Sequence, residues 1–456
     1  MCIRDSPYAL CYGGHQFGNW AGQLGDGRAI NLGQVRGQEG HRLVLQLKGA
    51  GPTPYSRRGD GYAVLRSSVR EFLCSEAMHH LGVPTTRALS LVASGEQVLR
   101  DMFYDGNARL EPGAVVCRVS RSFLRLGSFE LPAARGEIDL MRDLLGYCLR
   151  EYHPELEPPA AGEPIPPSMV LDWFEILATR TAELVVHWMR VGFVHGVLNT
   201  DNLSVLGETI DYGPYGWLED YDEHWTPNTT DAQGKRYRFG NQAAIAHWNL
   251  VRLASAIVPL AGEIEGLQAI VDAWPASYEL RWRAMMQSKL GLAQEPVDAE
   301  IVPDLGPLLS AAETDMTLFY RALADLPLHG DQGPSAEEVA AAFEDSHYQG
   351  QEFDRARIEA LVHWCRRYAL CAAAEGLGDT ARAERMNRVN PKVVLRNYLA
   401  QLAIDRAEKG DPEGIHELLD ALREPYLDRA GAEAFSGKRP EWARHRPGCS
   451  MLSCSS

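Results

Sequence analysis

The sequence contains no uninterrupted apolar run of about 18 residues, the length that a helix needs to cross a bilayer. Its first residues, M-C-I-R-D-S, lack the apolar core of a secretory signal peptide. None of the nine cysteines forms a C-x-x-C pair, so neither a structural zinc site nor a disulfide scaffold has support. These absences predict a protein of the reducing cytoplasm with no membrane partner.

Positive charge is also in short supply. The 456 residues include 45 Lys and Arg against 61 Asp and Glu, which gives a formal net charge of −16. Such a chain repels nucleic acid and anionic membranes, so we expect neither as a partner. No internal repeat is visible, and the length allows two or three domains or one large bilobal unit.

The first part of the chain, residues 1–127, is rich in glycine and in strand-like patterns. Residues 42–47 (R-L-V-L-Q-L) and 115–119 predict strands. Apolar residues recur at helical spacing through residues 61–80, which predicts a helix between these strands. We therefore expect a small, β-rich N-terminal lobe.

Helical patterns dominate residues 128–435, which we expect to form a larger C-terminal lobe. A proline-rich surface loop (155–167) and a short hairpin (204–211) interrupt them. The last residues, 436–456, are rich in Arg, Pro, Gly and Ser and predict a flexible tail. The expected helices cover residues 173–191, 243–259, 263–274, 278–292, 355–374 and 391–409. The fold class is thus α+β, and a small β-rich lobe before a helical lobe is typical of a protein-kinase-like fold.

One loop carries the skeleton of a kinase active site. Residues 195–213 read H-G-V-L-N-T-D-N-L-S-V-L-G-E-T-I-D-Y-G, against the kinase pattern H-R-D-x-x-x-x-N followed by D-F-G. His195 and Asn202 keep the kinase spacing, and Asp211 begins the D-Y-G that stands for D-F-G. Val197, however, occupies the position of the catalytic Asp. The loop therefore belongs to an inactive kinase relative or to an enzyme with different chemistry.

Other residues complete a phosphate and metal site. Lys48 ends an apolar strand, as the kinase lysine does, and Glu71 lies in the following helix, where the partner of that lysine is expected. Asn202 and Asp211 supply oxygen ligands for Mg²⁺ or Mn²⁺. Each residue alone is compatible with a solvated surface position, and Asn202 with Asp211 is compatible with ordinary turn chemistry.

Two further groups suit a nucleotide. The glycine-rich segment 13–28 only loosely resembles a phosphate-covering loop and is also compatible with a set of tight turns. Its end supplies candidate nucleotide-binding residues, and its His15 is better interpreted as a structural residue than as a base. Arg118 and Arg125 suit a polyphosphate tail, although surface ion pairs are an alternative. The candidate nucleotide-binding residues are Gly25, Asp26, Gly27, Arg28, Lys48, Arg118 and Arg125.

Asp201 is the candidate catalytic residue. It lies next to Asn202, four residues after the vacant position at Val197. A carboxylate there can accept a proton from an attacking hydroxyl, or it can cap the local turn. Spacing alone leaves both interpretations open.

Longer strings resemble one family. Y-G-G-H-Q-F-G-N-W-A-G-Q-L-G-D-G-R-A (12–29), L-Q-L-K-G-A-G-P-T-P-Y-S-R (45–57) and H-G-V-L-N-T-D-N (195–202) closely resemble the selenoprotein O family. The same holds for R-S-S-V-R-E-F-L-C-S-E-A-M, G-V-P-T-T-R-A-L, T-I-D-Y-G-P-Y-G and N-P-K-V-V-L-R-N-Y-L-A-Q. The likeness covers nearly the whole chain.

The resemblance implies a kinase-like fold that transfers AMP, rather than phosphate, from ATP to protein hydroxyls of Ser, Thr or Tyr. It implies that ATP binds inverted relative to a kinase, with pyrophosphate as the leaving group. By motif match, Lys48 would bind phosphate and pair with Glu71, and Arg118 and Arg125 would hold the outer phosphate. Asn202 and Asp211 would then bind Mg²⁺ or Mn²⁺, and Asp201 would activate the acceptor hydroxyl. The implied setting is the bacterial cytoplasm.

Two features depart from the family pattern. Family members carry a further segment before Y-G-G-H-Q-F-G, whereas that motif begins here at Tyr12, so we expect an N-terminally truncated small lobe. The chain ends Cys454-Ser455-Ser456, which matches the family's C-terminal motif and makes Cys454 a candidate redox residue. In some relatives this cysteine pairs with one in the loop after D-Y-G, but residues 215–241 contain no cysteine. Cys449 is a local alternative partner.

Two other functions remain open at this level. One is a kinase-type phosphotransferase in which Asp201 replaces the missing base. The other is a non-catalytic pseudokinase scaffold that binds nucleotide without turnover. The complete set of Lys48, Glu71, Asn202 and Asp211 favours an enzyme over the scaffold, because a scaffold has no need of a metal site.

Overall fold

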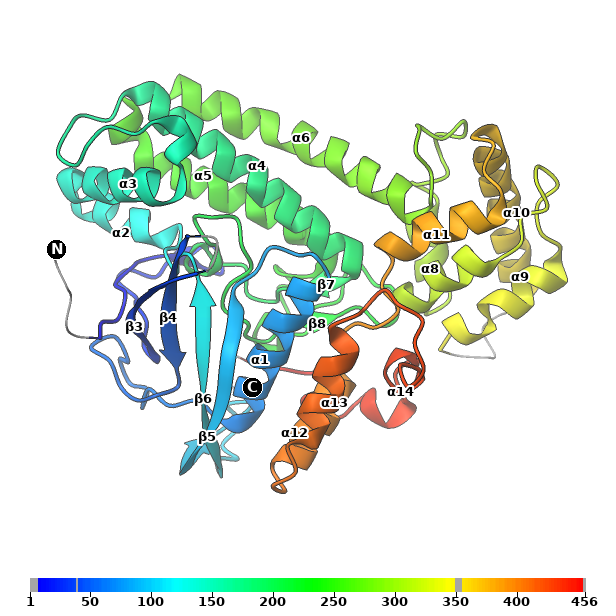
Figure 1. The fold of residues 1–456 in the computed structure, drawn as a ribbon, viewed down its shortest axis with the longest axis horizontal. Coiled ribbons are helices and arrows are strands. Elements are labelled where there is room, and N and C mark those ends of the chain that lie inside the picture. Colours follow the sequence, from blue (N-terminus) through cyan, green and yellow to red (C-terminus); the bar gives the residue numbers. More distant parts are fainter. Residues whose placement is uncertain (1–6, 38–39, 349–354, 454–456) are drawn as a thin grey trace.

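A four-stranded antiparallel sheet forms the first part of the fold. In the computed structural model, which describes residues 7–37, 40–348 and 355–453, the strands follow the order β3 (Ala29–Arg36), β4 (Arg42–Lys48), β6 (Arg109–Ser120) and β5 (Arg87–Arg100). Figure 1 shows β5 and β6 as a long hairpin beside α1. The strands expected at 42–47 and 115–119 are confirmed within β4 and β6.

Helix α1 (Leu65–His80) packs against β5 and β6. It begins four residues later than the sequence pattern predicts. The reason is that residues 61–64 pair as extended backbone, because Tyr62 bridges to Ala50 and Val64 bridges to Gly113. One face of α1, including Val69 and Leu73, is fully buried in the main hydrophobic core.

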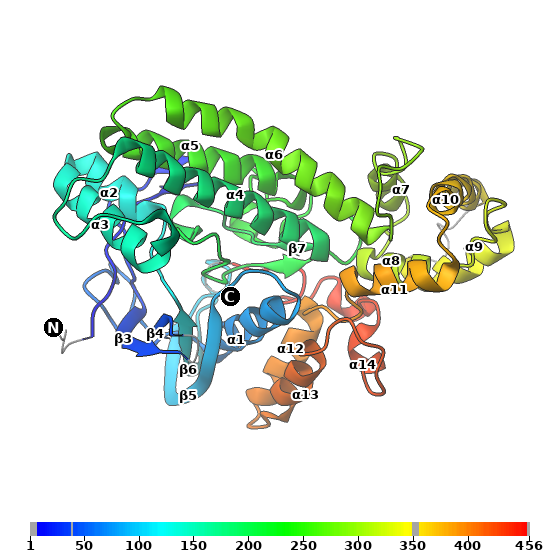
Figure 2. The ribbon, with the colours of Figure 1, turned by 45° about the horizontal axis from the view of Figure 1, so that its top comes forward.

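The larger helical part begins with α2 (Gly127–Arg135) and α3 (Ile138–Tyr152). It continues with the long helices α4 (Pro167–Val191), α5 (Gln242–Ala261) and α6 (Glu265–Lys289), which pack on one another (Figures 1 and 2). The expected mixture of a strand-rich first part and a helical majority is confirmed. The predicted break between 263–274 and 278–292 is wrong, because α6 is continuous.

Packing explains why α6 survives a proline at position 275. The Trp274 indole donates a hydrogen bond to the Ala178 carbonyl of α4 (2.9 Å) and stacks on Tyr278, one turn further along α6. Burial of this aromatic surface against α4 offsets the hydrogen bond that Pro275 cannot make.

One helical stretch among the described residues, Phe239–Ala261, is long and apolar enough to cross a membrane by length and composition alone. It consists mainly of α5, whose apolar face packs against α4, α6 and α2. Figure 2 shows α5 lying among these helices. Core helices pass the same test, so this stretch adds little to the question of a membrane.

A second hydrophobic core divides the helical part. The helices α7 (Leu305–Ser310), α8 (Met316–Asp325), α9 (Ala336–Phe343), α10 (Arg355–Ala374) and α11 (Asp379–Val389) gather around Phe319, Phe343 and Trp364. Figure 1 shows α8 to α11 at one end of α6, and Figure 2 shows α7 beside them. The single lobe expected over 128–435 therefore has two cores.

Two helices near the C-terminus pack on α1 of the first part of the chain. Helices α12 (Asn397–Ala407) and α13 (Glu413–Leu422) pack on α1, so the main core joins residues on both sides of the boundary predicted at 127. The helix expected over 391–409 starts only at Asn397, because the N–H groups of Lys392 and Val393 donate to the Pro425 carbonyl instead.

The C-terminal segment differs from the flexible tail expected over 436–456. After α14 (Glu433–Ser436) and a 3₁₀ turn (Glu441–Ala443), Leu452 is fully buried. Its N–H donates to the Pro227 carbonyl (3.0 Å), and its carbonyl accepts from Thr229 N–H (2.8 Å). Burial of an apolar side chain and paired backbone oppose mobility here. Cys454 lies outside the described residues.

Candidate active site

A cleft of about 780 Å³ lies where the sheet, the N-terminal hairpin and the loop after α4 meet. The hairpin consists of β1 (His15–Gln16) and β2 (Asn19–Trp20), and the loop contains the 3₁₀ turn Thr200–Asn202. The cleft lining includes every described residue predicted to bind nucleotide, metal or acceptor proton: Gly25, Asp26, Gly27, Arg28, Lys48, Arg118, Arg125, Asp201, Asn202 and Asp211. The topology therefore brings together residues that lie more than 180 positions apart in the sequence.

Lys48 lies at the end of β4 and is nearly buried. Its ammonium is 2.6 Å from a carboxylate oxygen of Glu71 on α1 and 3.9 Å from one of Asp211. Burial lowers the pKa of Lys48, although the Glu71 carboxylate opposes that shift. Glu71 therefore keeps a cation at the inner end of the cleft.

Arg118 lies on β6 next to Gln46 of β4 in the sheet register. Its guanidinium donates to Glu71 (3.0 Å), to Asp211 (2.7 Å) and to the Gln46 side-chain oxygen. The side chain is 2% exposed, as is that of Arg125. The alternative of surface ion pairs for these two arginines is therefore wrong.

Asp211 is the centre of this charge network. It accepts hydrogen bonds from Arg118 and Arg125 on its two different oxygens. Burial alone would raise the pKa of Asp211, but the guanidiniums of Arg125 and Arg118, together with Lys48, hold it well below its usual range. Its backbone has a positive φ of 57°, a strained conformation that Asp tolerates better than most residues and that is common at functional sites.

The segment 25–28 holds the charge network in place rather than forming a loop that covers phosphates. The Asp26 carboxylate is buried and accepts from Arg125 (3.2 Å), from the Tyr12 hydroxyl (3.2 Å) and from the Gln46 amide (3.1 Å). A side chain on Gly25, whose φ is +148°, would meet the Tyr55 ring at 2.5 Å. Asp26 thus positions Arg125, while Arg28 lines the open cleft.

Asp201 lines the same cleft, and its backbone carbonyl accepts a hydrogen bond from Arg125 (2.8 Å). One of its carboxylate oxygens accepts a hydrogen bond from the Gln16 side chain (2.9 Å), and the other is buried with no hydrogen-bond partner among the residues that the structure describes. Burial raises the pKa of Asp201 to about 6, although Gln16 and Arg125 oppose the shift. Only glycine fits at position 14, because a Cβ there would lie 2.8 Å from an Asp201 oxygen. A carboxylate with one unused oxygen and a pKa near neutrality can accept a proton.

The loop around Asp201 is held by its neighbours rather than by a hairpin. The hairpin predicted over 204–211 reduces to a single bridge between Leu203 and Thr209. Ser204 pairs instead with Arg125, and Thr209 pairs with Thr85, so both sides of the loop bond to the first part of the chain. Those longer-range bonds replace the local ladder.

His15 and His195 are structural, as expected for His15. The His15 ring is 2.7 Å from a Glu130 oxygen, and the backbone N–H of His15 donates to the Thr200 hydroxyl (2.7 Å). The buried ring of His195 contacts the Ile210 carbonyl (3.1 Å), and burial lowers its pKa. These contacts fix the hairpin 15–20 and the loop 195–202 against each other.

Asn202 and Asp211 fit a hard divalent cation in part. Asn202 donates its amide N–H to the Val197 carbonyl (2.8 Å), which leaves its side-chain oxygen available. Within the described residues no group of three His, Cys, Asp or Glu side chains could hold a metal alone. Mg²⁺ commonly takes one or two protein oxygens and completes its shell with phosphates and water. Metal binding at Asp211 would require its contacts with Arg118 and Arg125 to be shared or given up.

Sequence reasoning missed Gln16, Gln46 and Tyr12. Gln16 holds the Asp201 carboxylate, and the other two hold Asp26 and Arg118. A signal for Gln46 was present, because residues two apart on a strand share a face and Gln46 therefore points with Lys48. Gln16 and Tyr12 carry no such signal, since their contacts come from distant segments.

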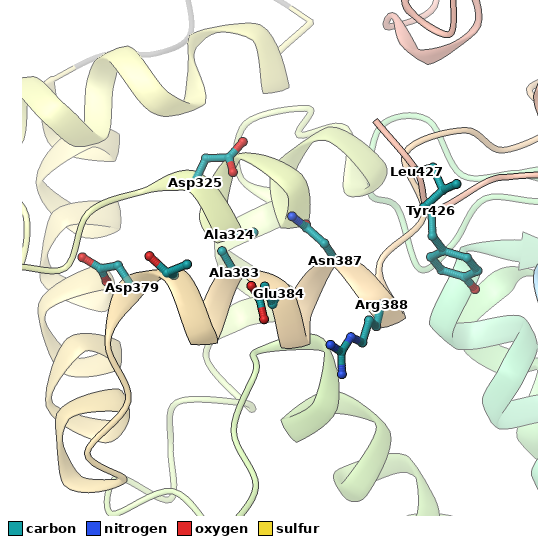
Figure 3. Close-up of a pocket in the computed structure, with 10 residues that line it drawn as sticks. Ala324, Asp325, Asp379, Ala383, Glu384, Asn387, Arg388, Tyr426 and Leu427 are labelled. Carbon is teal, nitrogen blue, oxygen red and sulfur yellow. The ribbon is translucent and has the colours of Figure 1, made fainter. Parts of the chain in front are cut away.

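A second hollow, of about 550 Å³, lies among α8, α11 and the segment after α13. Figure 3 shows Asp325, Asp379, Glu384, Asn387 and Arg388 around it. None of the predicted site residues that the structure describes lines this hollow. The candidate active site is therefore the cleft at Lys48 and Asp201.

Comparisons with known proteins identify the family of this chain. A family model described as "Protein adenylyltransferase SelO" matches residues 3–423. A "Protein nucleotidyltransferase YdiU" from Rhodopirellula baltica is 58% identical over 459 aligned residues, covering 99% of this chain and 85% of the relative. Proteins of the same name from Xanthomonas campestris pv. campestris (strain B100) and Azoarcus sp. (strain BH72) are 57% and 56% identical, each with 99% of this chain and 84% of the relative covered.

The cleft and these relatives together define an enzyme of the nucleotidyltransferase class. Within that class, the chain belongs to the SelO family of protein adenylyltransferases.

Proposed function

We propose that this protein transfers AMP from ATP to Ser, Thr or Tyr hydroxyls of other proteins and releases pyrophosphate. The observation that supports this most is the pair of groups that lines the cleft: cations gather around Asp211 and Glu71, and the Asp201 carboxylate beside them has one oxygen without a hydrogen-bond partner among the described residues. A leaving pyrophosphate needs the first group, and an acceptor hydroxyl needs the second.

The proposed architecture is bilobal and kinase-like, with ATP inverted relative to a kinase. The sheet with α1 supplies Lys48, Glu71 and Arg118, and the loop after α4 supplies Asp201 and Asp211. Val197, at the kinase base position, is 8% exposed and cannot move a proton. A base four residues later fits a nucleotide whose α-phosphate, rather than its γ-phosphate, is the reacting centre.

In the proposed reaction the acceptor oxygen attacks the α-phosphorus while its proton passes to the Asp201 carboxylate. The bond between the α-phosphorus and the bridging oxygen breaks, and pyrophosphate leaves with the bonding electrons. Lys48, Arg118 and Arg125 neutralise the charge that grows on the leaving group, and Glu71, Asp26 and Asp211 hold these cations in place. Mg²⁺ or Mn²⁺ held by Asn202 and Asp211 would add charge neutralisation on the phosphates.

Labelled ATP tests this proposal directly. We expect label from the α-phosphate, and none from the γ-phosphate, to enter acceptor protein in the presence of Mg²⁺ or Mn²⁺. Intact-mass analysis should show the addition of AMP. Transfer of γ-label would support a kinase-type phosphotransferase, and ATP binding without any transfer would support a pseudokinase scaffold.

Arg118→Ala should lower the rate of AMP transfer by about 10²–10³-fold, because a buried guanidinium aimed at developing charge is lost. The measurement is the initial rate of α-label incorporation. Arg142→Ala, which removes a half-exposed arginine on α3, is the control and should leave the rate unchanged. An unchanged rate in Arg118→Ala would contradict the assignment of the leaving group to this end of the cleft.

A further inference from the structure

An aromatic and cationic surface adjoins the acceptor side of the cleft. We define it as the acceptor face, and it consists of Phe17, Trp20, Arg236, Trp248 and Arg252. The Arg236 and Arg252 guanidiniums lie 4.8 Å and 5.2 Å from the Trp248 ring. The His15 ring lies 5.2 Å from Trp20 and 5.5 Å from Trp248, which joins the hairpin 15–20 to α5.

The acceptor face is continuous with the proposed base. Gln16, which hydrogen bonds to Asp201, and Phe17 both line the cleft. The Phe17 N–H donates to the Tyr237 hydroxyl (2.9 Å), and their rings lie 5.2 Å apart. Arg236 follows on the same side, since a Cβ at Gly18 would lie 3.4 Å from its guanidinium carbon. A segment entering the cleft toward Asp201 therefore passes over this face.

The charge of the face is unusual for this chain. The protein carries a net charge of −16, yet within the described part of the chain Arg236 and Arg252 form no ion pair. The nearby Asp231 carboxylate accepts instead from the backbone N–H groups of Arg236 (2.9 Å) and Tyr237 (2.7 Å). The Arg236 guanidinium also interacts with the Tyr237 hydroxyl, and the Nε atoms of both arginines are buried, so their terminal N–H groups are the ones that can donate to a carboxylate.

Phe17 adds an independent observation. It has a positive φ of 50° and is followed by Gly18 with φ 84°, so the hairpin turn places a bulky residue where glycine or asparagine is favoured. The ring is nevertheless 37% exposed. A strained aromatic residue whose ring stays partly exposed at a cleft mouth, beyond its contact with Tyr237, points to a role in binding.

We propose that the acceptor face docks acidic segments of partner proteins, with Glu or Asp flanking the hydroxyl residue that receives AMP. The docking of acidic segments does not depend on the proposed function. Only the statement that the docked segment carries the hydroxyl that receives AMP rests on it. Carboxylates would pair with Arg236 and Arg252, while Phe17 and Trp20 would cover the peptide backbone. The net negative charge of the rest of the protein would repel such segments and so favour binding at the acceptor face.

Short fluorescent peptides that differ only in flanking Glu, Gln or Lys around one Ser and one Tyr test the docking. We expect the Glu peptide to bind best and its affinity to fall with salt. In Arg236→Gln/Arg252→Gln, its affinity should fall about tenfold, as two pairs of moderate strength are lost, while the Gln peptide is unaffected. The control Arg355→Gln/Arg423→Gln, on α10 and after α13, should not change binding. Equal affinity for all three peptides, or an unchanged affinity in the double variant, would overturn the proposal.

Phe17→Gly provides a second variant that cannot fail through misfolding of the turn. Because glycine relieves the positive φ, which offsets the lost ring contact with Tyr237, the melting temperature should change little, whereas affinity for the Glu peptide should fall. Unchanged affinity would contradict a role for the ring. Intact-mass analysis of the same peptides with ATP separates the two proposals. Selective binding without AMP addition would contradict only the proposed function. AMP addition at equal rates to all three peptides would contradict only the docking preference.

Discussion

Asp211→Asn is expected to lower AMP transfer by at least about 10³-fold and to destabilise the protein by about 3 kcal/mol. The carboxylate accepts from Arg118 and Arg125 and lies 3.9 Å from Lys48. With Asp211 present, three cations face three carboxylates, since Asp26 and Glu71 complete the set. The amide leaves one buried positive charge unbalanced. Transfer by radiolabel and unfolding by urea measure the two effects.

A matched control is Asp139→Asn, which removes a carboxylate that is 96% exposed and pairs with Arg142. It should change neither activity nor stability, because exposed pairs contribute little. Pyrophosphate added without metal should raise the melting temperature of Asp211→Asn more than that of the wild type, because the variant has cations in excess. Full metal-dependent transfer by Asp211→Asn would contradict the proposed site.

Local patterns predict the sheet and the inner cations well. Lys48 stands at the end of an alternating strand and Glu71 within a periodic helix, so their contact follows once the helix packs on the sheet. Helix ends are harder to predict, because α1 loses its first residues to bridges with Ala50 and Gly113. In α6, tertiary packing at Trp274 overrides the proline signal.

The pairing of charged side chains in the cleft could not be predicted from the sequence. Arg118 and Arg125 can bind phosphate or pair with surface carboxylates, and only their burial beside Asp211 and Asp26 decides that they form a network. The hydrogen bond between Gln16 and Asp201 joins residues 185 positions apart. No local periodicity records such a contact, and the same holds for Leu452 against Pro227.

Asp201→Asn is expected to lower transfer by about 10²–10⁴-fold, the usual contribution of a positioned general base. Because the pKa of Asp201 is about 6, wild-type kcat/KM should rise with pH below that value and level off above about pH 7. The variant should lose this rise along with its activity. Steady-state rates across pH with a fixed acceptor peptide measure both.

Glu208→Gln is the matched control. Glu208 is a half-buried acid whose pKa is also raised by desolvation, but it accepts a hydrogen bond from Ser120 (2.9 Å) and does not line the cleft. Its substitution should leave the pH profile in place. If Asp201→Asn kept the wild-type profile, Asp201 would be a turn-capping residue rather than the base.

The raised pKa of Asp201 also predicts that Asp201→Asn is more stable than the wild type at high pH. Folding raises the pKa of Asp201 from its ordinary value of 3.8 to about 6, so the folded state binds more protons than the unfolded state between these values. Wild-type stability therefore falls as pH rises through this window, by up to about 3 kcal/mol for a shift of roughly two pKa units. Asp201→Asn lacks this loss and should melt higher than wild type at pH 8 but not at pH 4. A carboxylate that costs stability when ionised, yet is buried beside the cleft with one oxygen free, is better explained by proton transfer than by folding.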